Sequence, residues 1–122
     1  MANVINWFEI PATDIDRAVE FYKKVLDVDF HRVEMDGFKM AFFPMEEQSV
    51  GGSLCSGEGY KPSVDGAKIY LNGGEDLDTP LSKVEAAGGK VVMPKTKIND
   101  EFGYMAFFID SEGNSVAFHS PK

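Results

Sequence analysis

Apolar and polar residues alternate along the first part of the chain. From Val4 to Ile10 the alternation predicts a β-strand that places Phe8 and Ile10 on one face and Trp7 and Glu9 on the other. After this strand the spacing of apolar residues changes to i, i+3, i+4 and i+7, which is typical of an amphipathic helix. The apolar residues of this predicted helix are Ile15, Ala18, Val19, Tyr22, Val25 and Leu26.

Both halves of the chain contain signals for the start of a helix. Thr13 is the candidate N-cap of the first helix, and the carboxylate of Asp16 favours the positive end of its dipole. In the second half, Thr79 is predicted to cap a short helix with Pro80 at its first position, and Gly88-Gly89 to end it.

Short alternating segments separated by turn residues predict the remaining strands. They are expected at residues 29–33, 38–44, 49–55, 67–71, 90–93, 104–109 and 115–119. Asp36-Gly37 is a hairpin signal between the first two, and residues 111–114 form the last turn. Residues 56–65 are rich in glycine and predict a linker. Each half therefore follows the order strand, helix, strand, strand, strand.

A repeated phrase supports this division into halves. Met40-Ala41-Phe42-Phe43 returns as Met105-Ala106-Phe107-Phe108, and Asp14-Ile15-Asp16 returns as Asp76-Leu77-Asp78. The repeat predicts a single domain, residues 1–122, built from a module at 3–55 and a second at 66–120. The expected class is α+β: tandem βαβββ modules whose two mixed sheets form a curved trough.

Composition narrows the function. Hydrophobic residues make up 43% of the chain and the formal charge is −8, so a packed core is expected and nucleic-acid binding is not. The negative charge favours a cationic small molecule, although acidity also serves solubility. Cys55 is the only cysteine, and we expect its thiol to be structural. With neither a signal peptide nor a membrane span recognisable, we expect a cytoplasmic protein.

Several motifs resemble the vicinal oxygen chelate superfamily, which contains glyoxalase I, bleomycin-resistance proteins and extradiol dioxygenases. The matching residues are Trp7-Phe8-Glu9-Ile10-Pro11, Asp14-Ile15-Asp16-Arg17-Ala18, Phe21-Tyr22, Gly88-Gly89, Phe102-Gly103-Tyr104 and Phe108-Ile109-Asp110-Ser111-Glu112-Gly113-Asn114. The resemblance implies a glyoxalase-like fold and, by analogy with the bleomycin-resistance branch, a homodimer.

The resemblance also implies where a metal would bind. Metal-dependent members place one His, Glu or Gln ligand on the first and last strand of each module. Counting from the shared motifs and aligning the two halves assigns these positions to Trp7, Gly51, Lys68 and Ala117. None of the four is a competent ligand for a divalent metal, so we expect no metal at the usual site.

Two residues further along the same strands, the alignment predicts a polar ring of Glu9, Ser53, Tyr70 and His119. Glu9 and His119 are the candidate acid–base pair. The candidate ligand-binding residues are Trp7, Ser53, Lys68 and Tyr70, with Trp7 able to stack on a planar or cationic ligand. The alternative is structural: Glu9 pairs with Lys68, and His119 is merely solvated.

These residues favour a glyoxalase-like protein that binds a small organic molecule without a cofactor. The first alternative is a lyase or isomerase related to lactoylglutathione lyase, which would use Glu9 and His119, with a divalent metal at this displaced site as a further possibility. The second alternative is a structural or regulatory module without a small ligand. Neither a nucleic acid nor a membrane is an expected partner.

Overall fold

The computed structural model describes residues 3–122 and contains eight strands and two helices. In chain order they are β1 (Trp7–Pro11), α1 (Ile15–Leu26), β2 (His31–Met35), β3 (Phe38–Phe42), β4 (Gly51–Ser56), β5 (Tyr70–Asn72), α2 (Asp78–Leu81), β6 (Lys90–Asn99), β7 (Gly103–Ile109) and β8 (Ser115–Ser120). Within these residues, no helix combines the length and apolar composition that a membrane crossing requires.

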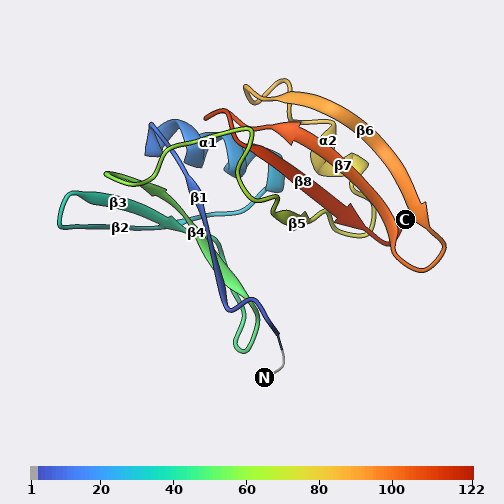
Figure 1. Cartoon of the computed structure of the whole chain (residues 1–122), viewed down its shortest axis with the longest axis horizontal. Helices are drawn as coiled ribbons and strands as arrows, with labels where there is room; N and C mark the ends of the chain where they lie inside the picture. Colours follow the sequence, from blue (N-terminus) through green and yellow to red (C-terminus); the bar gives the residue numbers. More distant parts are fainter. Residues whose placement is uncertain (1–2) are drawn as a thin grey trace.

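Each half of the chain forms its own four-stranded sheet with the same topology. The orders are β1-β4-β3-β2 and β5-β8-β7-β6, and Figure 1 shows the two sheets beside one another. In each sheet the first and last strands of the half are parallel and the other pairs are antiparallel. The repeated strand order, with few helices, confirms the predicted α+β class with two mixed sheets.

The strand ends differ from the prediction where pairing between strands begins later or continues further than the local sequence pattern indicates. β1 begins at Trp7 because its register with β4 begins at the Trp7–Gly51 pair. β5 is only three residues long, and β6 continues to Asn99 through irregular pairing with β7. The Asp36-Gly37 turn is confirmed, with φ values of 51° and 82° that suit a tight hairpin.

The first helix begins one residue later than expected. Asp14, with extended backbone angles, is the N-cap of α1, and its side chain accepts a hydrogen bond from the Arg17 N–H at 3.1 Å. Thr13 was the wrong choice because the side chain that accepts the N–H of the first turn belongs to Asp14. The Thr13 backbone N–H donates to the Glu112 carboxylate at 2.9 Å. At the other end, Asp27 adopts the left-handed conformation with φ 56° and its N–H bonds back to Lys23.

The second helix is a single turn. Thr79 lies inside α2, and the N-cap is Leu77, which provides no side-chain cap. The Asp78 N–H is instead satisfied by the side chain of Asp76 at 3.0 Å, while Leu77 N–H donates to Ser120 at 3.0 Å. The prediction of a Thr79 cap was therefore wrong, because Asp76 and the distant Ser120 provide the acceptors.

The hydrophobic core joins both modules. Tyr22 and Phe21 on α1 contact Phe108 of β7, with ring centroids 6.5 Å and 6.0 Å away, and Tyr22 also contacts Phe43 at 5.8 Å. Phe108 in turn stacks on Phe118 at 4.7 Å. Full burial of one such side chain stabilises the fold by about 1.5–3 kcal/mol. The apolar contacts of α1 therefore hold the two sheets together.

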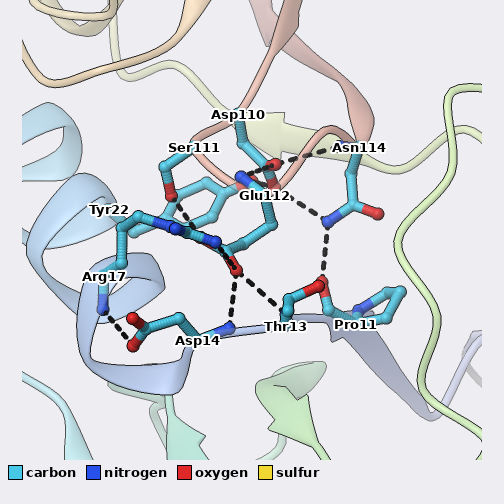
Figure 2. Close-up of polar contacts among 9 residues, drawn as sticks. All are labelled: Pro11, Thr13, Asp14, Arg17, Tyr22, Asp110, Ser111, Glu112 and Asn114. Carbon is cyan, nitrogen blue, oxygen red and sulfur yellow. Dashed lines mark hydrogen bonds and ion pairs between the residues drawn. The ribbon is translucent and has the colours of Figure 1, made fainter.

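A polar junction fixes the second module against the start of α1 (Figure 2). The Glu112 carboxylate, whose side chain is 1% exposed, accepts hydrogen bonds from Thr13 N–H, from Asp14 N–H at 2.8 Å and from Arg17 Nε at 2.6 Å. Burial raises the pKa of Glu112, but the hydrogen bonds from Arg17, Asp14 and Ser111 outweigh it, and the pKa lies below its ordinary value. Glu112 therefore binds as a carboxylate at the positive end of α1.

Neighbouring residues of the same turn complete this junction. The Tyr22 hydroxyl donates to Asp110 at 2.7 Å, and the Asn114 amide donates to the Pro11 carbonyl at 2.7 Å and to Asp110 at 3.0 Å. Burial, followed by the charge of Asp110, raises the pKa of Tyr22. We call Pro11, Thr13, Asp14, Arg17, Tyr22, Asp110, Ser111, Glu112 and Asn114 the module junction.

Candidate functional site

Strand register corrects the alignment of the two modules. In the first module Trp7 pairs with Gly51 and Glu9 with Ser53. In the second, Ala117 pairs with Tyr70 and His119 with Asn72. Tyr70, and not Lys68, is therefore the counterpart of Trp7, because the second module has one residue fewer, not one more, between this position and the helix start. Asn72 accordingly takes the place in the polar ring that was predicted for Tyr70.

The corrected positions do not fit a divalent metal. They hold Trp7, Gly51, Tyr70 and Ala117, which include neither an imidazole nor a carboxylate. Divalent metals in this kind of site take imidazole and carboxylate donors. Across residues 3–122 no three His, Cys, Asp or Glu side chains gather in a way that could hold a metal ion.

A cavity of about 750 Å³ lies between the two modules. It opens where the beginnings of β1 and β4 approach β5 and the segment that precedes it. Its lining is mostly apolar and comprises Ile5, Trp7, Phe8, Leu26, Val28, Phe43, Pro44, Val50, Gly51, Gly52, Lys68, Ile69, Tyr70, Leu71, Asn72 and Gly74. Three predicted ligand-binding residues, Trp7, Lys68 and Tyr70, are thus brought together.

Two glycines of β4 make room for the aromatic wall of this cavity. A Cβ atom on Gly51 would lie 2.9 Å from the Trp7 ring and 2.7 Å from the Met45 sulfur. A Cβ atom on Gly52 would lie 2.3 Å from the Phe8 ring, closer than any real contact. Because Trp7 and Phe8 are consecutive in β1, their rings cover opposite faces of the sheet. The Gly51-Gly52 pair therefore lets both rings lie against the β4 backbone.

The aromatic rings that face the cavity remain partly open to solvent. Trp7 is 39% exposed and meets Phe42 edge-on, with ring centroids 5.7 Å apart. Tyr70 is 50% exposed and meets Phe107 in the same way, also at 5.7 Å. Each sheet thus presents one aromatic ring, backed by a phenylalanine of its own module, to the space between them. Such rings are suited to stacking on a planar molecule.

The polar groups of the cavity are few. Lys68 Nζ donates to the Val64 carbonyl at 2.6 Å, and Asn72 accepts a hydrogen bond from the Gly74 N–H at 2.9 Å. The Tyr70 hydroxyl makes only a long contact with the Met105 sulfur at 4.0 Å. Lys68 and Tyr70 therefore retain hydrogen-bonding capacity for a bound molecule.

Glu9 belongs to a different environment. Its carboxylate accepts a hydrogen bond from the Tyr60 hydroxyl at 2.7 Å, and this bond raises the pKa of Tyr60 to about 12. It lines a separate cavity of about 210 Å³ with Lys61 and Asn114. The ion pairs of residues 3–122 do not join Glu9 to Lys68, so the pair expected under the structural alternative is not formed.

Ser53, the strand partner of Glu9, is buried. It is 0% exposed, and its hydroxyl lies 3.2 Å from the Cys55 sulfur. Burial raises the pKa of the Cys55 thiol, which keeps it protonated and poorly nucleophilic at neutral pH. Neither residue lines the 750 Å³ cavity.

His119 lies on β8 of the second sheet, exposed, with Nε2 donating to the Phe102 carbonyl at 2.5 Å. In the sheet its neighbours are Asn72 and Met105. Glu9 lines the 210 Å³ cavity, whereas His119 lines neither that cavity nor the one of 750 Å³. The structure therefore does not assemble the candidate acid–base pair.

Sequence reasoning missed part of the cavity wall. Phe43, Pro44 and Val50 lie at the ends of β3 and β4, and Asn72 lies on β5. The Gly51-Gly52 pair was a usable signal, because two glycines in a strand often mark a close approach of large side chains. Asn72 was missed because the alignment of the modules was shifted.

Together, the paired sheets and the apolar inter-module cavity define an α+β domain of the two-module type. Residues 4–118 match the family model described as Glyoxalase/Bleomycin resistance protein/Dioxygenase superfamily. The protein belongs to this family.

Known proteins similar to this chain fall in the same group. A glyoxylase-like domain-containing protein of Didymella fabae is 31% identical over 118 residues, covering 93% of this chain and 90% of its own. TnmS3, an antibiotic binding protein from a Streptomyces species, superimposes with a TM-score of 0.73 at 20% identity, covering 100% of this chain and 99% of its own. A mutant of glyoxalase I from Zea mays gives 0.71 at 16% identity, covering 94% of this chain, which spans only 45% of that protein.

Proposed function

We propose that this protein binds a small organic molecule in the cavity between β1, β4 and β5, without the metal centre of its family. The observation that carries the proposal is the cavity itself, with a volume of about 750 Å³ and Trp7 and Tyr70 facing it from different modules. Ligand sites are commonly apolar clefts of about 300–1,000 Å³ with a few polar groups. The side chains at the family's metal positions further support binding without a metal.

The family offers both binding proteins and enzymes as precedents. TnmS3 is described as an antibiotic binding protein, and its fold is shared over the whole length of this chain. Glyoxalase I is the enzymatic precedent. The lyase alternative would require Glu9 and His119 to act on one molecule, whereas these residues have separate surroundings. Binding is therefore the better supported function.

The only tryptophan of the chain gives a direct test. A thermal-shift screen of small organic compounds would supply ligands, and Trp7 fluorescence would then be titrated with each hit. We expect saturable changes in fluorescence, because a ligand in the cavity alters the surroundings of the indole ring. Calorimetry of Trp7→Ala should show weaker binding, whereas Phe102→Leu, a change at an exposed aromatic outside the cavity, should leave it intact. Hits that bind Trp7→Ala as tightly as the parent would contradict the proposal.

Cytoplasmic location and assembly into a homodimer are proposed on sequence and family grounds. They affect this function differently. Location would determine which compounds the protein meets. A dimer partner could cover part of the exposed aromatic face of the trough.

A further inference from the structure

We propose that the cavity prefers a planar aromatic carboxylate, with Lys68 pairing with the carboxylate and Trp7 and Tyr70 holding the aromatic body. This inference rests on the proposed function and narrows it to a chemical class. It runs against the net charge of the chain, which by itself favours cations.

The charge of the cavity is opposite to that of the whole chain. The formal charge is −8, yet the residues that line the cavity include neither Asp nor Glu, and Lys68 is their single charged side chain. Interactions between exposed charges weaken beyond roughly 8–10 Å at physiological salt. Asp27 and Glu75 adjoin lining residues in the chain but do not line the cavity themselves, so Lys68 is the charge that a ligand inside it contacts directly.

The contacts of Lys68 leave its charge available. Its ammonium group donates to the Val64 carbonyl at 2.6 Å, and the ion pairs of residues 3–122 do not include it. An ammonium group has three donors, so further hydrogen bonds to an anion can form. A carboxylate would complete this arrangement without displacing an existing ion pair.

The remaining walls suit a planar apolar body. Trp7 and Tyr70 are partly exposed and come from different sheets, and Val50, Pro44 and Leu71 add apolar surface around them. Lys68 precedes Tyr70 by two residues on the approach to β5. The Lys68 ammonium group therefore lines the cavity close to the Tyr70 ring. A flat molecule with one carboxylate matches both the cation and the aromatic rings.

Three compounds of the same shape test the preference. They are 2-naphthoate, 2-naphthamide and 2-naphthylmethylamine, which place a negative, neutral or positive group on one ring system. Trp7 fluorescence and calorimetry would measure their affinities for the parent protein, Lys68→Met, Lys68→Arg and Lys90→Met. Lys90→Met is the matched control because it removes the same charge from β6, away from the cavity.

We expect the carboxylate to bind most tightly. Lys68→Met should weaken it up to about fivefold, the range of an exposed ion pair, while binding of the amide stays unchanged. Lys68→Arg and Lys90→Met should still bind the carboxylate more tightly than the amide or the amine. An amide or amine that binds as tightly as the carboxylate, or no response from any of the three, would overturn the inference. The proposed function is decided separately, by the library screen, and survives if compounds of another class bind at Trp7.

Discussion

At the scale of single residues, the aromatic wall of the cavity depends on two positions of β4 that lack a side chain. Gly51 and Gly52 occupy the strand that faces Trp7 and Phe8, and even a methyl group there would meet an aromatic ring or the Met45 side chain. Sequence patterns placed Trp7 correctly on the face opposite Phe8, because alternation in a strand is a local property. They did not reveal the Glu112 cap of α1, since its carboxylate comes from a turn far along the chain.

A glycine substitution tests this packing. Gly52→Ala should lower the free energy of unfolding by about 1–3 kcal/mol, because the new Cβ overlaps the Phe8 ring and forces it to move. Urea denaturation would measure the change. Gly66→Ala is the control: its Cβ would meet no atom within 4 Å and its φ is not positive, so a change within about 0.5 kcal/mol is expected. Equal effects of the two substitutions would contradict the packing described for β4.

At the scale of elements, the module junction determines how the second sheet meets α1. Helix and strand periodicity predicted α1 and the repeated strand order, because both follow from local patterns. The register of β5 was not predictable in the same way. The second module is one residue shorter before its helix, and only pairing with β8 reveals that Tyr70 lies beside Ala117. This shift also explains why Lys68 was wrongly aligned with Trp7.

Glu112→Gln tests the junction. Loss of the charge-assisted hydrogen bonds should cost about 1–3 kcal/mol of the free energy of unfolding at pH 7. The pKa of Glu112 is lower in the folded protein, so its contribution is complete above the unfolded pKa and is lost as pH falls through the folded pKa. The difference between parent and variant should therefore shrink on acidification below about pH 4.5, near the ordinary value for glutamate.

Denaturation curves measured from pH 7 to pH 3 would check this pH dependence. Glu47→Gln, a change of the same chemistry in an exposed loop, is the control and should have little effect at any pH. A stability difference for Glu112→Gln that stays constant or grows toward acid pH would contradict the carboxylate role of Glu112.

At the scale of the whole molecule, two sheets of the same topology leave an apolar space between modules. The repeat in sequence was sufficient to predict this architecture. The residues that a ligand would contact in this space were harder to predict. The alignment of the modules placed Glu9 and His119 in one polar ring, but in the folded chain Glu9 binds Tyr60 and His119 binds the Phe102 carbonyl. Function in this family therefore has to be inferred from the cavity and not from the fold alone.

The homodimer expected from the family is a separate prediction at this scale. Analytical ultracentrifugation at micromolar concentration should give the mass of two chains. Met35, exposed at 55%, lies with Trp7 on the face of the first sheet away from α1, and Met35→Lys should weaken a dimer formed through it. Lys24→Met, a change on α1, is the control. A monomer at all concentrations would contradict the prediction.

The most direct test of the central claim is amide NMR of the protein with a compound from the screen. Binding in the inter-module cavity should shift the signals of Gly51, Gly52, Tyr70 and Asn72 in a saturable way, while amides near His31 on the outer strand β2 stay unchanged. Saturable shifts that cluster elsewhere and leave Gly51 and Tyr70 unaffected would contradict binding between the modules.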